Sequence, residues 1–172
     1  MRGSRGSGIG GGRGRGRGRT AAVGSAVVGA LAALSLAYAP AAGAVTPTLA
    51  TADYDCGTWG GGQARLTATQ DGTRATMTLR SAVKTPVAVA ADTINATLTF
   101  AKAGGGTKAF TGMRNPALPA FGSVVIGPLS ATVAPGDSLN SYFAGPALTM
   151  TIFGFPVSCD AVTSQSPGPF VF

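Results

Sequence analysis

Residues 64–80 alternate between apolar and polar side chains, with Asp71 and Gly72 at the centre of the pattern. Neighbouring side chains of a β-strand point to opposite faces, so this period of two predicts two strands with one face on a core and the other in water. An Asp-Gly pair between such strands favours a type I′ hairpin, because both central residues of that turn need a positive φ. The apolar positions are Ala64, Leu66, Ala68, Ala75, Met77 and Leu79.

Similar short runs follow along the chain, and none of them has the sustained apolar spacing of three and four residues that indicates a long helix. A turn is expected at Pro135-Gly136-Asp137, where proline, glycine and aspartate each favour chain reversal. Seven or so short strands separated by turns predict an all-β domain over residues 53–163, built as a two-sheet antiparallel β-sandwich. A small barrel is the alternative. The further expected strands lie within 94–100, 108–111, 124–133 and 148–152.

Residues 1–44 have the layout of a cleavable signal peptide. An Arg/Gly-rich segment without acids is followed by an uncharged, Ala-rich stretch over 21–39 and by the small-residue exit Ala42-Gly43-Ala44. This order of a positive, an apolar and a small-residue region predicts export with cleavage after Ala44, leaving a secreted chain that begins at Val45. The alternative is an uncleaved leader that anchors the protein at the cell envelope, since the apolar stretch approaches the length needed to span a bilayer.

The positive charge of the whole chain, +7, is concentrated in this leader. After position 44 there are seven Lys and Arg residues against six Asp, so the mature chain carries about one net positive charge. A balance this even argues against nucleic acid as a partner and against stable membrane insertion once the leader is removed. The mature chain divides into a short segment over 45–52, the β domain over 53–163 and a Pro/Gly/Ser tail over 164–172.

The two cysteines, Cys56 and Cys159, lie near the two ends of the expected domain. An exported chain with an even number of cysteines is expected to form disulfides, and the absence of a C-x-x-C motif argues against a redox-active pair. A bond between them closes a loop of roughly 100 residues, which is worth about 4–5 kcal/mol in the chain-entropy model. We therefore expect a structural disulfide that ties the first strand to the last.

The composition disfavours enzyme chemistry. The chain contains no histidine, so the commonest general base and the commonest metal ligand are both missing. Gly136-Asp137-Ser138-Leu139 matches the signature of a large esterase family, but that family needs a histidine to activate the serine, and the segment also reads as ordinary turn chemistry. We expect a protein that is not an enzyme and that needs neither a cofactor nor a metal.

Three aromatic residues are candidate ligand contacts: Trp59, Phe143 and Phe153. Trp59 is the only tryptophan and lies in a glycine-rich segment, from which it can stack on a flat ligand or pack against the neighbouring disulfide. A concave pocket lined by these residues would favour a small-molecule carrier, whereas an exposed apolar patch on one sheet would favour a protein partner.

Taken together, the Ala/Gly-rich leader, Tyr54-x-Cys56, the Thr-rich strands, Gly127-Pro128-Leu129 and the late Cys159 resemble small exported actinobacterial proteins with an immunoglobulin-like β-sandwich, a family without an assigned function. The chain also looks broadly like secreted carriers of enediyne antibiotics, which share the sandwich but have two disulfides. The resemblance implies a single immunoglobulin-like sandwich and brings no catalytic residues. The expected function is a secreted, non-catalytic binding or structural domain with an unknown protein or small-molecule partner; the alternative is a small-molecule carrier with a cleft in the sandwich.

Overall fold

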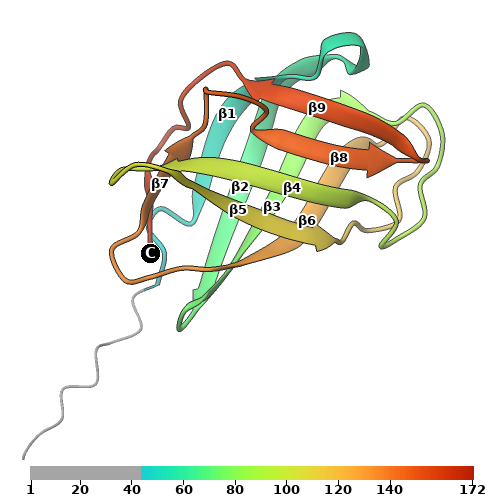
Figure 1. Ribbon diagram of the computed structural model, residues 1–172. Helices are drawn as coiled ribbons and strands as arrows, with labels where there is room; N and C mark the ends of the chain where they lie inside the picture. The colour runs from blue at the N-terminus through green and yellow to red at the C-terminus, as the bar shows by residue number, and fades with distance from the viewer. Residues whose placement is uncertain (1–43) are drawn as a thin grey trace, which may run out of the picture. The chain divides into compact units, whose positions relative to one another are not determined.

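The computed structural model describes residues 44–172 and shows an all-β domain (Figure 1). The predicted leader, with its cleavage site after Ala44, lies outside the described residues except for Ala44 itself. Within the described residues no helix is long and apolar enough to cross a membrane. The strands are β1 (Leu49–Asp55), β2 (Gly61–Asp71), β3 (Arg74–Lys84), β4 (Asn95–Lys102), β5 (Thr107–Met113), β6 (Ser123–Thr132), β7 (Ser138–Ser141), β8 (Leu148–Ile152), β9 (Phe155–Ala161) and β10 (Phe170–Val171); a short 3₁₀ helix, η1 (Gly57–Trp59), follows β1.

Eight of the strands form a closed antiparallel barrel in the order β4-β5-β6-β3-β2-β1-β9-β8. The ring closes because the first half of β4 pairs with β8, from Asn95 opposite Thr151 to Leu98 opposite Leu148. The second half of β4 extends past β8 and pairs with β7, which in turn pairs with β10. β7 and β10 are therefore two outer strands attached to the ring.

The predicted immunoglobulin-like sandwich is wrong, and the barrel that was its alternative is the fold. Alternation along a strand identifies the side chains that face a core, but it does not say whether the outermost strands pair with each other. Here β8 meets β4 through four residue pairs, and this contact turns two facing sheets into one closed sheet. Closure also removes the exposed edges that a sandwich would present to other chains.

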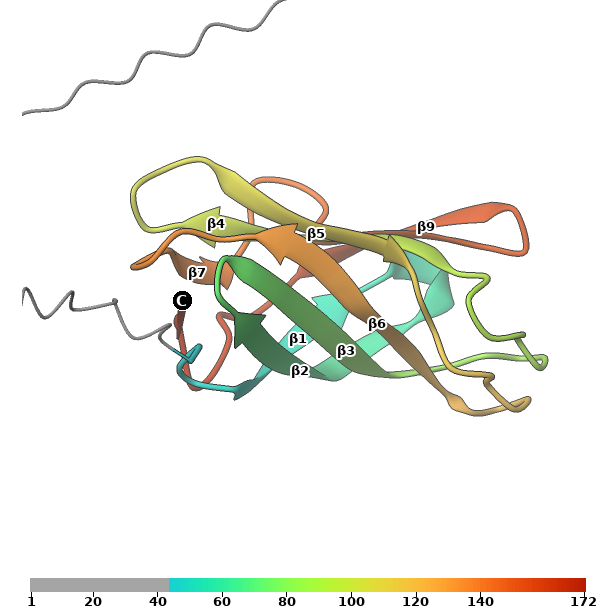
Figure 2. The ribbon, with the colours of Figure 1, turned by 90° about the horizontal axis from the view of Figure 1, so that it is seen from below.

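The barrel is flattened into two walls (Figure 2). The front wall, facing the viewer of Figure 1, consists of β9, β8, β4 and β5, and the back wall of β1, β2, β3 and β6. Inward side chains of both walls make one continuous core, in which Leu66 and Met77 from the back wall and Leu98 and Phe110 from the front wall are fully buried. The walls join at a β1–β9 seam and at a β5–β6 seam.

The hairpin predicted over 64–80 is confirmed, with Leu66 opposite Leu79 in the core. Its turn differs from the prediction by one residue. Asp71 pairs with Arg74, so Gly72 and Thr73 are the central residues, and only Gly72 has a positive φ, 58°. The apolar alternation fits both registers equally. The observed register places glycine where a type II′ turn needs it and sets the two opposite charges across from each other.

One end of the barrel is closed by aromatic side chains that include the tail. Phe100 contacts Phe110 and Phe170 edge to face, with ring centroids 5.7 and 6.1 Å apart, and Phe172 packs on Phe110. The Gly136 amide donates to the Phe172 carbonyl oxygen at 2.6 Å, which holds the end of the chain at the turn after β6. Residues 164–172, which the sequence predicts as a Pro/Gly/Ser tail, thus contribute β10 and part of the core at this end.

The disulfide between Cys56 and Cys159 is present, and no described cysteine is free. It lies at the β1–β9 seam, where only two residue pairs, Tyr54 with Ala161 and Asp55 with Asp160, join the strands. The cysteines are the next pair in this register, so the covalent bond extends a short ladder. The prediction of a disulfide is confirmed, but the bond joins the end of β1 to β9 and not to the last strand, β10. Such a bond is consistent with an oxidising, extracellular compartment.

Candidate functional site

The end of the barrel opposite the C-terminus is framed by η1, by the loops over 85–94 and 114–122, and by the β8–β9 turn (Figure 1). Two of these loops hold each other through their backbones: the Thr85 amide donates to Gly122, and the Phe121 amide donates to Thr85. Val89 and Leu118 form a further bridge between the same loops. We call this end the mouth.

An apolar pocket of about 140 Å³ opens at the mouth. Its wall is formed by the disulfide and by the ends of β3, β6, β8 and β9. The wall side chains are Cys56, Val83, Val124, Met150, Ile152 and Val157. Lys84 is the only charged residue in the lining, and Thr85, the other polar one, is buried. The pocket therefore offers an apolar ligand contact area with almost no unpaired polar atoms.

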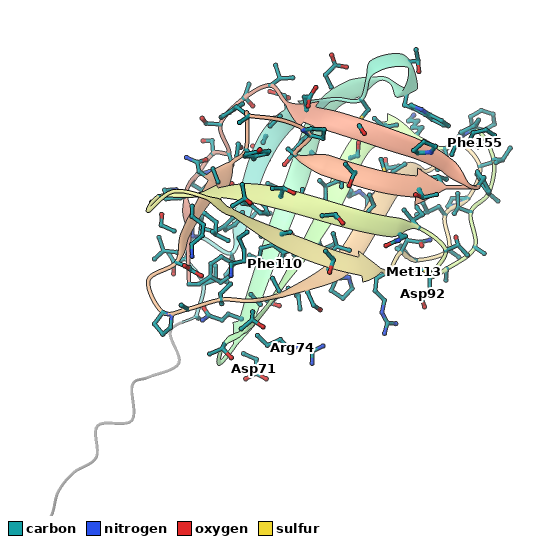
Figure 3. The ribbon with its side chains drawn as sticks, in the orientation of Figure 1. Asp71, Arg74, Asp92, Phe110, Met113 and Phe155 are labelled. Carbon is teal, nitrogen blue, oxygen red and sulfur yellow. A yellow bond between two sulfur atoms is a disulfide. The ribbon has the colours of Figure 1, made fainter. Side chains whose placement is uncertain are left out.

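The rim of the pocket consists of large apolar side chains that point into solvent. They are Trp59 on η1, Val87 in the loop after β3, and Phe153 and Phe155 in the β8–β9 hairpin. Trp59 is 41% exposed and Phe155 is 62% exposed, and Figure 3 shows Phe155 at the tip of this end. Exposed apolar groups that gather around an apolar pocket mark a binding site more often than a chance surface, because their exposure lowers solubility without stabilising the fold.

The β8–β9 hairpin holds one of these aromatics in an unfavourable backbone conformation. Ile152 pairs with Phe155, so Phe153 and Gly154 are the central turn residues, and both have a positive φ, 53° and 81°. This is the pattern of a type I′ turn, whose first central position favours Asn, Asp or Gly. Phenylalanine there costs roughly 1 kcal/mol. Phe121, 73% exposed in the loop before β6, also has a positive φ, 60°. Strain of this kind persists where a side chain has to be presented in one direction.

A buried asparagine fixes the loops behind the rim. The Asn115 side-chain oxygen accepts hydrogen bonds from the amides of Thr93 and Ile94, each at 2.8 Å. Its side-chain nitrogen donates to the carbonyl oxygens of Ala90 and Pro116, at 2.7 and 2.8 Å. All four hydrogen bonds of the amide are made, so Asn115 couples the loop over 85–94 to the loop over 114–122. The loop over 85–94, which supplies Thr85, Pro86 and Val87 to the pocket lining, is thereby held in a defined shape.

The closest ion pair lies at the closed end, away from the mouth, whereas an exposed pair, Arg114 with Asp92 at 3.7 Å, joins the two loops of the mouth. The Asp137 carboxylate accepts the Ala134 amide and pairs with Lys102 at 2.8 Å, and these two contacts hold the pKa of Asp137 below its ordinary value. Asp137 also approaches Lys108 at 4.0 Å. The segment that matches the esterase signature is thus a charge-stabilised turn. Burial raises the pKa of the Tyr54 phenol, which therefore stays neutral at physiological pH.

The structure brings together two of the three predicted ligand-contact residues. Trp59 and Phe153 both line the pocket, whereas Phe143 lies in the segment between β7 and β8 and is not part of the lining. Phe155 was not predicted as a ligand contact from the sequence. The signal that could have found it is the Phe153-Gly154-Phe155 segment, in which two phenylalanines flank a turn glycine. Among the described residues no group of three or more His, Cys, Asp or Glu side chains is placed to hold a metal ion.

Comparison with protein-family models, with curated proteins and with solved structures gave no match for this chain. The resemblance to exported actinobacterial immunoglobulin-like domains is wrong, because the eight strands close into a barrel. The features that carried it were mainly compositional: Thr-rich strands, glycine turns and two distant cysteines serve either architecture.

Proposed function

We propose that this chain is an exported, non-catalytic binding protein whose mouth takes up the apolar end of a small molecule. The observation that carries the proposal is the apolar pocket beneath the exposed rim of Trp59, Phe153 and Phe155. The open ends of β-barrels and apolar hollows with few polar groups are preferred ligand sites. Export rests on the signal-peptide pattern, and the disulfide is compatible with it.

The size of the pocket limits what it can hold. A volume of about 140 Å³ is close to that of apolar cavities that bind benzene, so one aromatic ring or a short branched alkyl group fits. A larger ligand would place only its end inside and would lay the remainder against the rim. Because Lys84 is the only charge in the lining, a single acidic or hydrogen-bond-accepting group near the apolar end would be the favoured polar contact.

Trp59 provides the assay, because the only tryptophan of the chain lines the pocket. Benzene, toluene and isobutanol, titrated into the purified protein, are expected to change the Trp59 emission with dissociation constants on the order of 1 mM, about 4 kcal/mol. Glucose at the same concentrations serves as a polar comparison and is expected to leave the emission unchanged. Amide chemical shifts measured by NMR would locate the bound ring next to Val124 and Val157.

Two matched variants connect binding to the rim. Phe153 and Phe143 are both 56% exposed, but only Phe153 lines the pocket. Phe153→Asn is expected to weaken toluene binding at least fivefold and to keep the hairpin, because asparagine tolerates the positive φ of this turn position. Phe143→Asn is expected to leave binding unchanged. Equal effects of the two substitutions, or an emission that none of the apolar probes alters, would overturn the proposal.

A further inference from the structure

The outer faces of the two barrel walls differ in charge. The back wall carries six charged side chains on β1, β2 and β3, which the strand registers place on its outer face. They are Asp53, Asp55, Arg65, Asp71, Arg74 and Arg80. The outer face of the front wall carries a single charged residue, Asp160, near the end of β9. The charged side chains on the outer faces of the two walls therefore lie almost entirely on the back wall.

The outer face of the front wall carries mainly hydroxyl-bearing side chains instead of charged ones. The registers align Ser158 with Thr149, Thr149 with Thr97, and Thr97 with Thr111, so one row crosses all four front strands. Three intervals of about 4.8 Å between neighbouring strands give the row a length of roughly 14 Å. A second row runs beside it, in which Thr151 and Asn95 lie opposite each other. We call these six side chains, five with a hydroxyl group and one, Asn95, with an amide, the hydroxyl wall.

The hydroxyl wall is hollowed and its polar groups are free. An open groove of about 300 Å³ runs over it and is lined by five of its side chains; only Thr111 is outside the lining. In the described part of the chain, none of the six side chains hydrogen bonds to another protein group, whereas on the back wall the hydroxyl oxygens of Thr69 and Thr76 lie 2.7 Å apart. Pro156 lies opposite Thr151, and the exposed Met113, labelled in Figure 3, lies opposite Asn95, so apolar atoms border the second row at both ends.

We propose that the hydroxyl wall binds a neutral polysaccharide. Each hydroxyl both donates and accepts hydrogen bonds, which matches the dense donors and acceptors of a sugar chain, and the flanking Pro156 and Met113 match its C–H surfaces. A charged partner such as nucleic acid would find no positive charge on the outer face of the four strands, because Lys102 and Lys108 pair with Asp137 at the closed end. An apolar protein surface would bury these hydroxyls without partners, which costs free energy for each group. The site lies on a different face from the mouth and does not depend on the function proposed for it.

Affinity electrophoresis tests the proposal with the purified protein. Native gels contain dextran, a β-glucan, a mannan or an arabinan, and polygalacturonate serves as the acidic comparison. At least one neutral polysaccharide is expected to retard the protein, and polygalacturonate is expected to have no stronger effect. Thr97→Val combined with Thr149→Val, a directly opposed pair, is expected to lower the affinity at least tenfold, because valine keeps the shape and strand preference of threonine and removes its hydroxyl.

The matched control is Thr67→Val combined with Thr78→Val, an opposed pair of the same exposure on the outside of the back wall. This control and Phe153→Asn at the mouth are both expected to change the retardation less than twofold. Retardation by none of the four neutral polysaccharides, retardation by polygalacturonate alone, or equal losses in both double valine variants would overturn the proposal. Sedimentation tests whether the wall instead binds a second copy of the chain. The proposal would be overturned if the protein self-associates, if Thr97→Val with Thr149→Val abolishes the self-association, and if no polysaccharide competes with it.

Discussion

Replacing both cysteines with alanine is expected to remove a large part of the stability of this barrel. Cys56 and Cys159 are 103 residues apart, and in the chain-entropy model a loop of this length stabilises the folded state by about 4.7 kcal/mol. A domain of this size has a free energy of unfolding of about 5–15 kcal/mol in total. The double variant Cys56→Ala/Cys159→Ala should therefore be folded only marginally, with a loss of about 4–5 kcal/mol.

Urea denaturation followed by circular dichroism and by Trp59 fluorescence measures this loss. The variant is expected to unfold at a lower urea concentration and with a steeper dependence on urea, because its unfolded chain exposes more surface than the cross-linked one. Should the variant be unfolded in plain buffer, added sulfate strengthens apolar burial and brings the transition into range. A loss below about 2 kcal/mol would refute the reasoning, since it would mean that the unfolded chain is compact without the bond.

Hydrogen exchange separates the effect on the unfolded state from an effect on the seam. Only two residue pairs join β1 to β9 beside the disulfide, so the amides of Asp55 and Asp160 are expected to gain a local opening route in the variant. Amides of the β2–β3 hairpin, such as Leu66 and Leu79, should exchange through global unfolding in both proteins. Equal acceleration at all of these sites would show that the bond acts through the unfolded chain alone.

Three shorter predictions concern other parts of the molecule. Asn115→Ala is expected to cost about 3 kcal/mol in urea denaturation, because it removes the acceptor of the part-buried Thr93 amide and of the buried Ile94 amide, and a loss below 1 kcal/mol would contradict the role given to Asn115. The pKa of Asp137 is lowered in the folded protein, so its ionised carboxylate stabilises the fold. This stabilisation is complete above about pH 4 and is lost as the pH falls through the pKa of Asp137 in the folded protein. The melting temperature of the wild type should therefore fall more steeply in acid than that of Asp137→Asn. The intact mass of protein recovered from culture medium is expected to begin at Val45 and to show no alkylation before reduction; retention of the leader would favour the envelope-anchored alternative.

Strand content was predictable from the sequence because alternation is a local property. The pattern of Leu66, Met77 and Leu79 places these side chains on one face whatever the partner strands are, and the structure buries all three. Closure of the ring was not predictable, because it depends on β8 reaching β4 across some fifty residues of chain. Nothing in Leu148–Ile152 distinguishes a strand that ends a sheet from one that closes a barrel.

The candidate site shows the same division between local and non-local information. Phe143 and Phe153 look alike in the sequence and have the same exposure, yet only Phe153 borders the pocket. The difference arises because β8 lies between them and carries the chain from the closed end, which Phe100 and Phe170 fill, to the open one. The local clue was the hairpin turn itself, in which a phenylalanine occupies a position that favours asparagine or glycine. A residue that breaks a turn preference with no gain in burial, as Phe153 does, is therefore a more specific candidate for a binding contact than an exposed aromatic residue in general.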